Sequence, residues 1–227
     1  MKSVIASLLM ALRPPDIRLC AFDLDGTLVD AFPAITDSIN HMMRAMRLSP
    51  QSLSVVKRSV GLGVENLVRC FVLEEDVPRA LAIFREHHDA RLRRNIRLLP
   101  GAKSLLPFLK AQGCVLAVAT NRPLQFCQII LEALGVVKYF DHVLCGDMVA
   151  RPKPYPDMLQ EILRQSGIPA SSALYVGDMT VDVACARAAG FFSVGVPTGS
   201  CTRDELEAVG PGMMVDRLSQ VRGLFRK

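Results

Sequence analysis

Short apolar runs alternate with longer amphipathic segments along most of the chain. The apolar runs are bounded by turn or acidic residues, as expected for buried strands, and cover residues 17–22, 114–119, 142–145, 173–176 and 192–196. Apolar positions at helical spacing predict helices over residues 102–112, 124–134, 156–166 and 181–189. Strands that alternate with helices favour an α/β fold, in which helices cover both faces of a parallel sheet.

One long segment interrupts this alternation. Residues 31–97 carry no convincing strand pattern, only apolar stripes that predict about four helices. The stripes consist of Ile35, Ile39, Met42 and Met46, then Leu53, Val56 and Val60, then Leu67, Cys70 and Phe71, and last Leu81 and Phe84. We therefore expect an inserted all-helical cap domain over residues 31–97, within a core domain of residues 16–30 and 98–227.

Residues 1–15 are expected to form an N-terminal extension to that core. Apolar residues at helical spacing in residues 1–12 predict a short amphipathic helix. A signal peptide is the alternative, but Lys2 is the only positive charge before the apolar stretch, and no small-residue cleavage site follows it.

Composition and charge exclude several classes of protein. Hydrophobic residues make up 50% of the 227 and charged residues 22%, which is typical of a folded chain and not of a disordered one. The net charge of +5 is spread along the chain, and its one basic cluster, Arg91, Arg93, Arg94 and Arg97, is expected to be a solvated helix end. No apolar run is long enough to span a bilayer. We expect neither a nucleic acid nor a membrane as partner, and the sequence does not indicate an oligomeric state.

The cysteines indicate a reducing environment, so we expect a cytoplasmic protein. There are 7, an odd number, and none forms a C-x-x-C pair that would suit zinc. Cys20, Cys114 and Cys145 lie in apolar runs and are expected to be buried without a chemical role.

Two carboxylates follow the first predicted strand. Asp23 and Asp25 are separated by one residue in the segment D-L-D-G-T, so both can project to the same side, and Gly26 permits a tight turn after them. Open parallel sheets bind ligands beyond the carboxyl ends of their strands. One acid of such a pair can act as nucleophile or metal ligand and the other as proton donor. The alternative of simple turn residues is weak, because this five-residue pattern is rare by chance.

Three further groups stand after later strands. Asp178 and Asp182 follow the strand at 173–176, where Asp178 alone would otherwise be read as a helix cap. Thr120 and Asn121 close the strand at 114–119 and offer a hydroxyl and a backbone amide to phosphoryl oxygens, or merely a helix cap. Lys153 lies in the proline-rich segment R-P-K-P-Y-P-D, which would hold its ammonium in place.

These four motifs, in this order, resemble those of the haloacid dehalogenase superfamily. The resemblance covers residues 17–218 and implies a Rossmann-like core, and the helical insert between the first and second motifs is similar to the caps of its first subfamily. Residues 22–40, 60–63, 120–123 and 153–154 most resemble the phosphoglycolate phosphatases.

The resemblance implies a magnesium-dependent phosphatase that acts on a small phosphorylated metabolite. Asp23 would attack phosphorus to form an aspartyl phosphate, and Asp25 would protonate the leaving oxygen and later activate water. Mg²⁺ would bind Asp23, the backbone carbonyl of Asp25, and Asp178. Asp182 would orient the metal site or Lys153.

Phosphate contacts would come from Thr120, the amide of Asn121 and Lys153. Residues 60–64 form the cap loop expected to touch substrate, through Gly61 and Gly63, although these glycines are as readily read as an interhelical turn. Hinges are expected near Asp30 and residues 98–101, and Asp30 has the alternative role of capping the first cap helix.

Other activities remain open on the same residues. A dehalogenase would lack Asp25, and a β-phosphoglucomutase-like phosphotransferase would carry a histidine where residues 31–34 read A-F-P-A. Pyrophosphate hydrolysis and a non-catalytic binding module are further alternatives.

Overall fold

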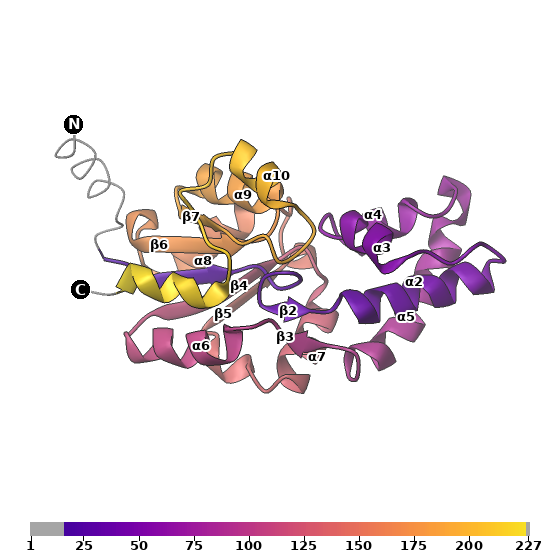
Figure 1. The fold of residues 1–227 in the computed structure, drawn as a ribbon, viewed down its shortest axis with the longest axis horizontal. Helices are drawn as coiled ribbons and strands as arrows, with labels where there is room; N and C mark the ends of the chain where they lie inside the picture. The colour runs from indigo at the N-terminus through magenta and orange to yellow at the C-terminus, as the bar shows by residue number, and fades with distance from the viewer. Residues whose placement is uncertain (1–15, 226–227) are drawn as a thin grey trace.

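The computed structural model describes residues 16–225, and its centre is a parallel sheet (Figure 1). The strand order is β5-β4-β1-β6-β7-β8, with every neighbouring pair parallel. The strands are β1 (Leu19–Phe22), β4 (Val115–Thr120), β5 (His142–Cys145), β6 (Ala173–Gly177), β7 (Phe192–Gly195) and β8 (Met213–Met214). The expected parallel α/β sheet is therefore confirmed.

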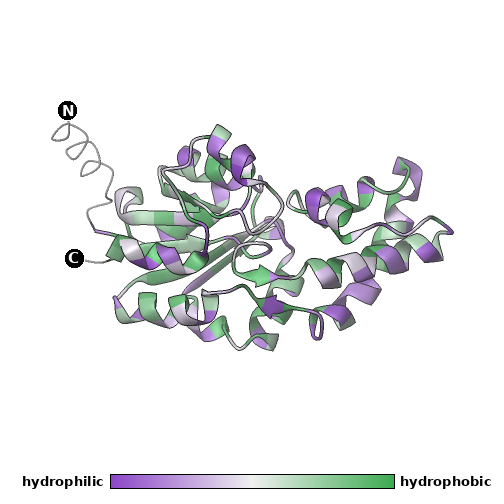
Figure 2. Cartoon of the chain, in the orientation of Figure 1, coloured by the Kyte–Doolittle hydropathy of each residue, from purple (hydrophilic) through white to green (hydrophobic). Residues whose placement is uncertain are grey.

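Helices cover both faces of the sheet, because successive side chains of each strand point to opposite faces. On β1, Leu19 and Ala21 belong to one apolar cluster, and Cys20 and Phe22 belong to the other. The first cluster is completed by α8 (Asp157–Ser166) and α9 (Thr180–Ala189). The second is completed by α6 (Ala102–Ala111), α7 (Leu124–Ala133) and the 3₁₀ segment η5 (Leu218–Phe225). Figure 2 shows the central strands as the most apolar part of the molecule.

Four α-helices occupy residues 31–97, all of which the structure describes. They are α2 (Phe32–Ala45), α3 (Leu53–Ser59), α4 (Val64–Arg69) and α5 (Val77–Leu92), with the 3₁₀ turn η1 (Glu74–Asp76) between the last two. The stripe of Ile35, Ile39 and Met42 is buried, and α2 packs mainly on α5. Figure 1 shows this helical group beside the sheet.

A short antiparallel pair connects the helical group to the sheet. β2 (Val29–Asp30) pairs with β3 (Arg97–Leu98), at the positions where hinges are expected. Asp30 does not cap α2, whose N-cap is Ala31 without a side-chain hydrogen bond; the Asp30 carboxylate instead accepts from Arg97 at 2.8 Å.

All five strands and four core helices expected from the sequence are present, and the helix bounds agree within one residue. The structure also contains elements that the sequence did not predict: β2, β3, β8, α10 (Arg203–Ala208) and η5. The amphipathic helix expected within residues 1–12 lies outside the described residues. No helix in residues 16–225 is long and apolar enough to cross a membrane. Cys20, Cys114 and Cys145 are buried free thiols, as expected.

Candidate active site

The candidate catalytic residues lie together because three neighbouring strands end at the same level. Phe22 of β1 is in register with Val118 of β4 and Val176 of β6, so the residues that follow them share one edge of the sheet. Asp23 follows β1, and its backbone N–H donates to the carbonyl of Val176 at 2.9 Å. The structure thus brings together chain segments about 100 and 150 residues apart.

Lys153 reaches this edge from the loop between β5 and α8. Its ammonium donates to Asp23 Oδ1 at 2.7 Å, to Asp182 Oδ1 at 2.7 Å and to Tyr175 Oη at 2.9 Å, and the residue is 4% exposed. Burial would lower the pKa of Lys153, but the charges of Asp182 and Asp23 outweigh burial and raise it. The lysine is therefore a fixed cation with all three donors occupied.

Asp23 lies where negative charge exceeds positive charge. Burial, together with the charges of Asp182 and Asp25, raises the pKa of its carboxyl to about 6 against the opposing effect of Lys153.

Three carboxylates form a compact oxygen cluster at the same edge. Oxygen atoms of Asp23, Asp178 and Asp182 lie within 4.8 Å of one another. Asp178 is oriented by Thr27 Oγ1, which donates to Oδ1 at 2.8 Å, and by the Ser200 N–H, which donates to Oδ2 at 2.8 Å.

This cluster has the chemistry of a divalent cation site. Burial raises the pKa of Asp178 well above its usual value, and the charges of Asp23 and Asp182 raise it further, so a cation among these carboxylates would relieve their repulsion. The donors are all oxygen atoms, which hard cations prefer. The backbone of Gly26 and of Gly199 packs directly on Asp178: a Cβ on Gly26 would lie 2.6 Å from Oδ2, and one on Gly199 would overlap it.

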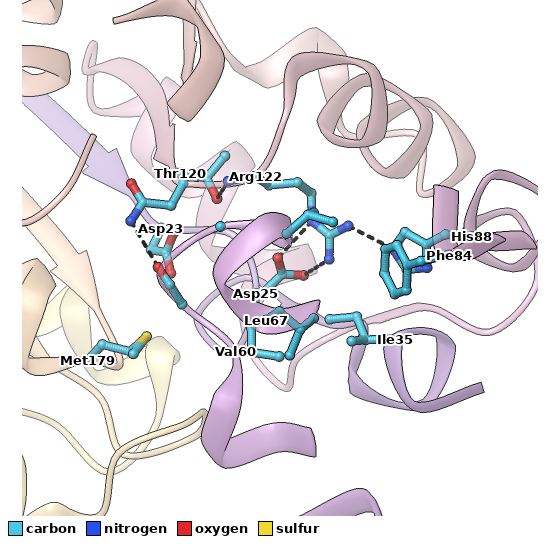
Figure 3. A pocket seen from close by; sticks show the side chains of 14 residues that line it. Asp23, Asp25, Ile35, Val60, Leu67, Phe84, His88, Thr120, Arg122 and Met179 are labelled. Carbon is cyan, nitrogen blue, oxygen red and sulfur yellow. Dashed lines mark hydrogen bonds and ion pairs between the residues drawn. The ribbon is translucent and has the colours of Figure 1, made fainter. Parts of the chain in front are cut away.

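The Asp25 side chain points away from the oxygen cluster and pairs with Arg122. Arg122 Nε donates to Oδ2 at 2.7 Å and Nη2 donates to Oδ1 at 2.8 Å, in a two-pronged ion pair whose side chains are 5% and 10% exposed. The remaining guanidinium nitrogen, Nη1, lies 3.0 Å from His88 Nε2 on α5. Figure 3 shows this line of contacts running from Asp25 to the helical group.

Asn121 joins three parts of the site, whereas Thr120 stays close to its own strand. The Asn121 side-chain amide donates to the carbonyls of Gly61 at 2.9 Å and Lys153 at 3.0 Å, and its oxygen accepts from the Lys153 N–H at 2.8 Å. Thr120 is buried at the end of β4 and its Oγ1 accepts from the Arg122 N–H at 3.3 Å.

A pocket lies between the sheet edge and the helical group (Figure 3). Its polar wall comes from the sheet side, and its apolar wall comes mostly from α2, α4, α5 and the segment between α3 and α4. The apolar lining residues are Ile35, Val60, Val64, Leu67, Phe84 and Met179. Gly61 and Gly63 also line it, and a Cβ on Gly61 would overlap the side chain of Met179. Residues 60–64 are thus next to the predicted catalytic residues.

Three residues of this site were given no role by the sequence patterns: Arg122, His88 and Tyr175. Arg122 directly follows the Thr-Asn pair, so a charge at a strand end was a usable signal. His88 lies four residues after Phe84 on the buried face of α5, where a polar side chain requires a partner. Tyr175 lies inside an apolar strand, and no pattern there indicates that its hydroxyl meets Lys153.

Comparison with known proteins agrees with this geometry. Residues 20–196 match the sequence pattern of a family described as "haloacid dehalogenase-like hydrolase". A phosphoglycolate phosphatase of Pseudomonas fluorescens strain Pf0-1 is 32% identical over 213 residues, which cover 90% of this chain and 78% of that protein. The "probable phosphatase IndB" of Dickeya dadantii strain 3937 is 35% identical over 212 residues, covering 90% and 92%.

A similar solved structure is that of a predicted phosphoglycolate phosphatase from Haemophilus somnus 129PT. It has a TM-score of 0.88 and 29% identity, and the match covers 92% of this chain and 98% of that one.

Because the family match spans most of the chain, the chain belongs to the haloacid dehalogenase-like hydrolases. Within that class it is a phosphatase, and it resembles the phosphoglycolate phosphatases in sequence and in structure. Phosphatases of this class generally use a divalent metal, and the acidic cluster of Asp23, Asp178 and Asp182 is the matching feature here.

Proposed function

We propose that this phosphatase uses Mg²⁺ to hydrolyse a small phosphate monoester through an aspartyl phosphate, with phosphoglycolate as the first candidate substrate. The observation that carries the proposal is the meeting of Asp23, Asp178 and Asp182 with the Lys153 ammonium at one sheet edge. Such a site presents a nucleophile and positive charge to one phosphoryl group.

In the first step a carboxylate oxygen of Asp23 forms a bond to phosphorus while the ester P–O bond breaks. Asp25 gives its proton to the leaving oxygen, which departs as a hydroxyl group. In the second step the oxygen of a water molecule forms a bond to the phosphorus of the aspartyl phosphate, the bond between phosphorus and the Asp23 oxygen breaks, and Asp25 accepts a proton from that water as inorganic phosphate leaves. Both carboxyl groups return to their starting states, so one proton cycles through Asp25.

The cation would be held by Asp23, the backbone carbonyl of Asp25, and Asp178. When bound, it would neutralise charge on the phosphoryl oxygens. Asp182 keeps the Lys153 ammonium beside Asp23, and Thr120 and the amide of Asn121 would contact the remaining phosphoryl oxygens.

We assign the core to residues 16–30 and 98–227 and the cap to residues 31–97. The cap loop at 60–64, through Gly61 and Gly63, would cover the substrate and exclude water, which strengthens the electrostatic interactions below it. A cap that closes over the phosphoryl site would favour a small metabolite as substrate.

Phosphate release from a panel of small esters and pyrophosphate, with Mg²⁺ or with EDTA, tests the proposal. We expect Mg²⁺-dependent release that Asp23→Asn lowers by at least roughly a thousandfold, because no other group replaces the nucleophile. Asp204→Asn, an exposed aspartate on α10, is the matched control and should retain turnover. Wild-type turnover by Asp23→Asn would contradict the mechanism, and absence of release from every substrate would contradict the function.

A further inference from the structure

Neither carboxylate oxygen of Asp25 is free to meet a leaving oxygen in the arrangement described above. Both of its carboxylate oxygens accept hydrogen bonds from Arg122, at 2.7 and 2.8 Å. A two-pronged guanidinium contact of this geometry occupies the carboxyl group that would have to face the leaving oxygen. Some other group must therefore take the place of Asp25 on Arg122 during turnover.

That group should carry a negative charge. Arg122 is 6% exposed, and a buried guanidinium that loses its partner is strongly destabilised. A carboxylate of the substrate in the place of Asp25 keeps the buried guanidinium paired. If the substrate offers only a hydroxyl group, Arg122 keeps Asp25.

The surroundings of Arg122 strengthen its selectivity for a carboxylate over a hydroxyl group. Among the described residues that line the pocket, Arg122 alone carries a positive charge, and the wall facing it is apolar. An ion pair formed in such surroundings is stronger than one in water, because the local dielectric constant is low.

His88 holds the guanidinium of Arg122 in this position and does not compete with a carboxylate for its Nε and Nη2 atoms. Arginine has no acceptor, so Nη1 must donate to His88 Nε2, and the proton of His88 must be on Nδ1, 3.0 Å from Ser38 Oγ. The Ser38 hydroxyl in turn donates to the Ala34 carbonyl at 3.0 Å. The chain Arg122, His88, Ser38 and Ala34 therefore anchors one side of the guanidinium to α2 and α5, and leaves the Nε and Nη2 edge for a carboxylate.

We propose that Arg122 recognises a carboxylate on the leaving group of the substrate, and that this carboxylate displaces Asp25 from Arg122 and so releases the Asp25 side chain toward the leaving oxygen. The inference rests on the proposed phosphatase function and deepens it: the preferred substrates are phosphate esters of small hydroxy acids. In phosphoglycolate a single carbon separates the leaving oxygen from the carboxylate, which suits neighbouring contacts to Asp25 and Arg122.

The test compares phosphoglycolate with 2-hydroxyethyl phosphate, which replaces the carboxylate by a hydroxymethyl group. Wild-type kcat/KM should favour phosphoglycolate by about 100-fold or more, as the loss of one partner from a buried charge implies. In Arg122→Met that preference should fall to within about tenfold, and Arg122→Lys should be intermediate because an ammonium lacks the two-pronged geometry.

A binding measurement complements the kinetics and does not require Arg122 to be changed. The ratio of the dissociation constants of the two esters, by calorimetry with Mg²⁺, is compared between Asp25→Asn and Asp23→Asn. The ratio cancels the shared phosphate and metal contributions. It should favour phosphoglycolate about tenfold more in Asp25→Asn, where no carboxylate competes for Arg122.

The outcomes separate this inference from the function on which it rests. Equal kcat/KM for the two esters, or a preference that persists in Arg122→Met, overturns the role of Arg122 and leaves the phosphatase function intact. If Arg122→Met does not fold, equal binding ratios in the two aspartate variants overturn it instead. Failure of the wild-type protein to release phosphate from any ester overturns both.

Discussion

At the scale of single residues, the site is governed by buried charges and by which partners they have. Asp23, Asp178 and Asp182 share one ammonium, that of Lys153, so negative charge is in excess at the sheet edge. The raised pKa of Asp23 and Asp178 follows from this excess together with burial. The Asp25 and Arg122 pair is balanced by itself. The two aspartates of the first motif therefore occupy different electrostatic environments.

His88 predicts a measurable effect of pH on stability. Burial and the Arg122 charge lower the pKa of His88 from 6.5 to about 2, so the folded protein keeps it neutral while the unfolded chain binds a proton below pH 6.5. Acid thus favours the unfolded state. Relative to His88→Gln, the wild-type free energy of unfolding should fall by about 2 kcal/mol between pH 7 and pH 5.

Urea unfolding of both proteins at the two pH values checks this expectation. Titration of the active-site aspartates is common to both proteins and cancels in the difference. A difference between wild type and His88→Gln that stays constant with pH would mean that His88 binds a proton as readily in the folded protein as in the unfolded chain.

The sequence could predict the residues of the site that stand at the end of a strand or directly after it. Asp23, Thr120 and Asp178 could be found this way, because strand ends of a parallel sheet meet at one edge. Arg122 and His88 could not be paired from the sequence, since 34 residues separate them and their contact depends on how α5 packs against the sheet. The direction of the Asp25 side chain was equally hidden, because it is set by Arg122.

At the scale of elements, prediction succeeded where a pattern was long enough to show a period. The core helices each hold 10 residues, and their bounds lie within one residue of the predicted ones. The strands β2, β3 and β8 have two residues each, which is too short for alternation to be visible. Each of these strands is defined by its pairing with a neighbouring strand, and this pairing depends on the tertiary fold.

The loop after β7 predicts a variant with weakened metal binding. Gly199 packs on Asp178 so closely that a Cβ would overlap Oδ2, and the neighbouring Ser200 N–H donates to the same oxygen. Gly199→Ala should therefore displace Asp178 and raise the Mg²⁺ concentration for half-maximal activity by about tenfold or more. The measurement is phosphate release over a Mg²⁺ titration.

Gly223→Ala is the matched control, because a Cβ there meets nothing within 4 Å. Its Mg²⁺ dependence should equal that of the wild type. Thermal unfolding in EDTA shows whether Gly199→Ala is folded without the metal; a folded Gly199→Ala with wild-type Mg²⁺ dependence would exclude Asp178 as a ligand.

At the scale of the whole molecule, the helical group is held against the sheet by two sets of contacts. In the pocket, Asn121 donates to the carbonyl of Gly61 and Arg122 donates to His88. Outside the pocket lining, the guanidinium of Arg58 on α3 donates to Glu205 of α10 at 2.7 and 2.6 Å, and also to the Ser200 carbonyl at 2.8 Å. The structure is therefore that of a covered site.

The contact between Arg58 and Glu205 should stabilise this covered state in a salt-dependent way. Both side chains are partly open to solvent, at 53% and 40% exposure, so dissolved ions screen their attraction. Arg58→Ala should raise KM for phosphoglycolate by about two- to fivefold at low salt, with a smaller effect on kcat, because Arg58 lies outside the pocket lining.

The wild-type KM should in turn rise toward that of Arg58→Ala when the salt concentration increases from 0.05 M to about 1 M, where the screening length falls to about 3 Å. Arg164→Ala is the control, because Arg164 pairs with Glu161 inside α8 and does not bridge the two parts of the molecule. Salt also weakens the attraction of an anionic substrate, and both variants share that effect. The difference in KM between Arg58→Ala and Arg164→Ala therefore isolates the contact, and a difference that does not shrink with salt would assign the effect of Arg58 to its bond with the Ser200 carbonyl.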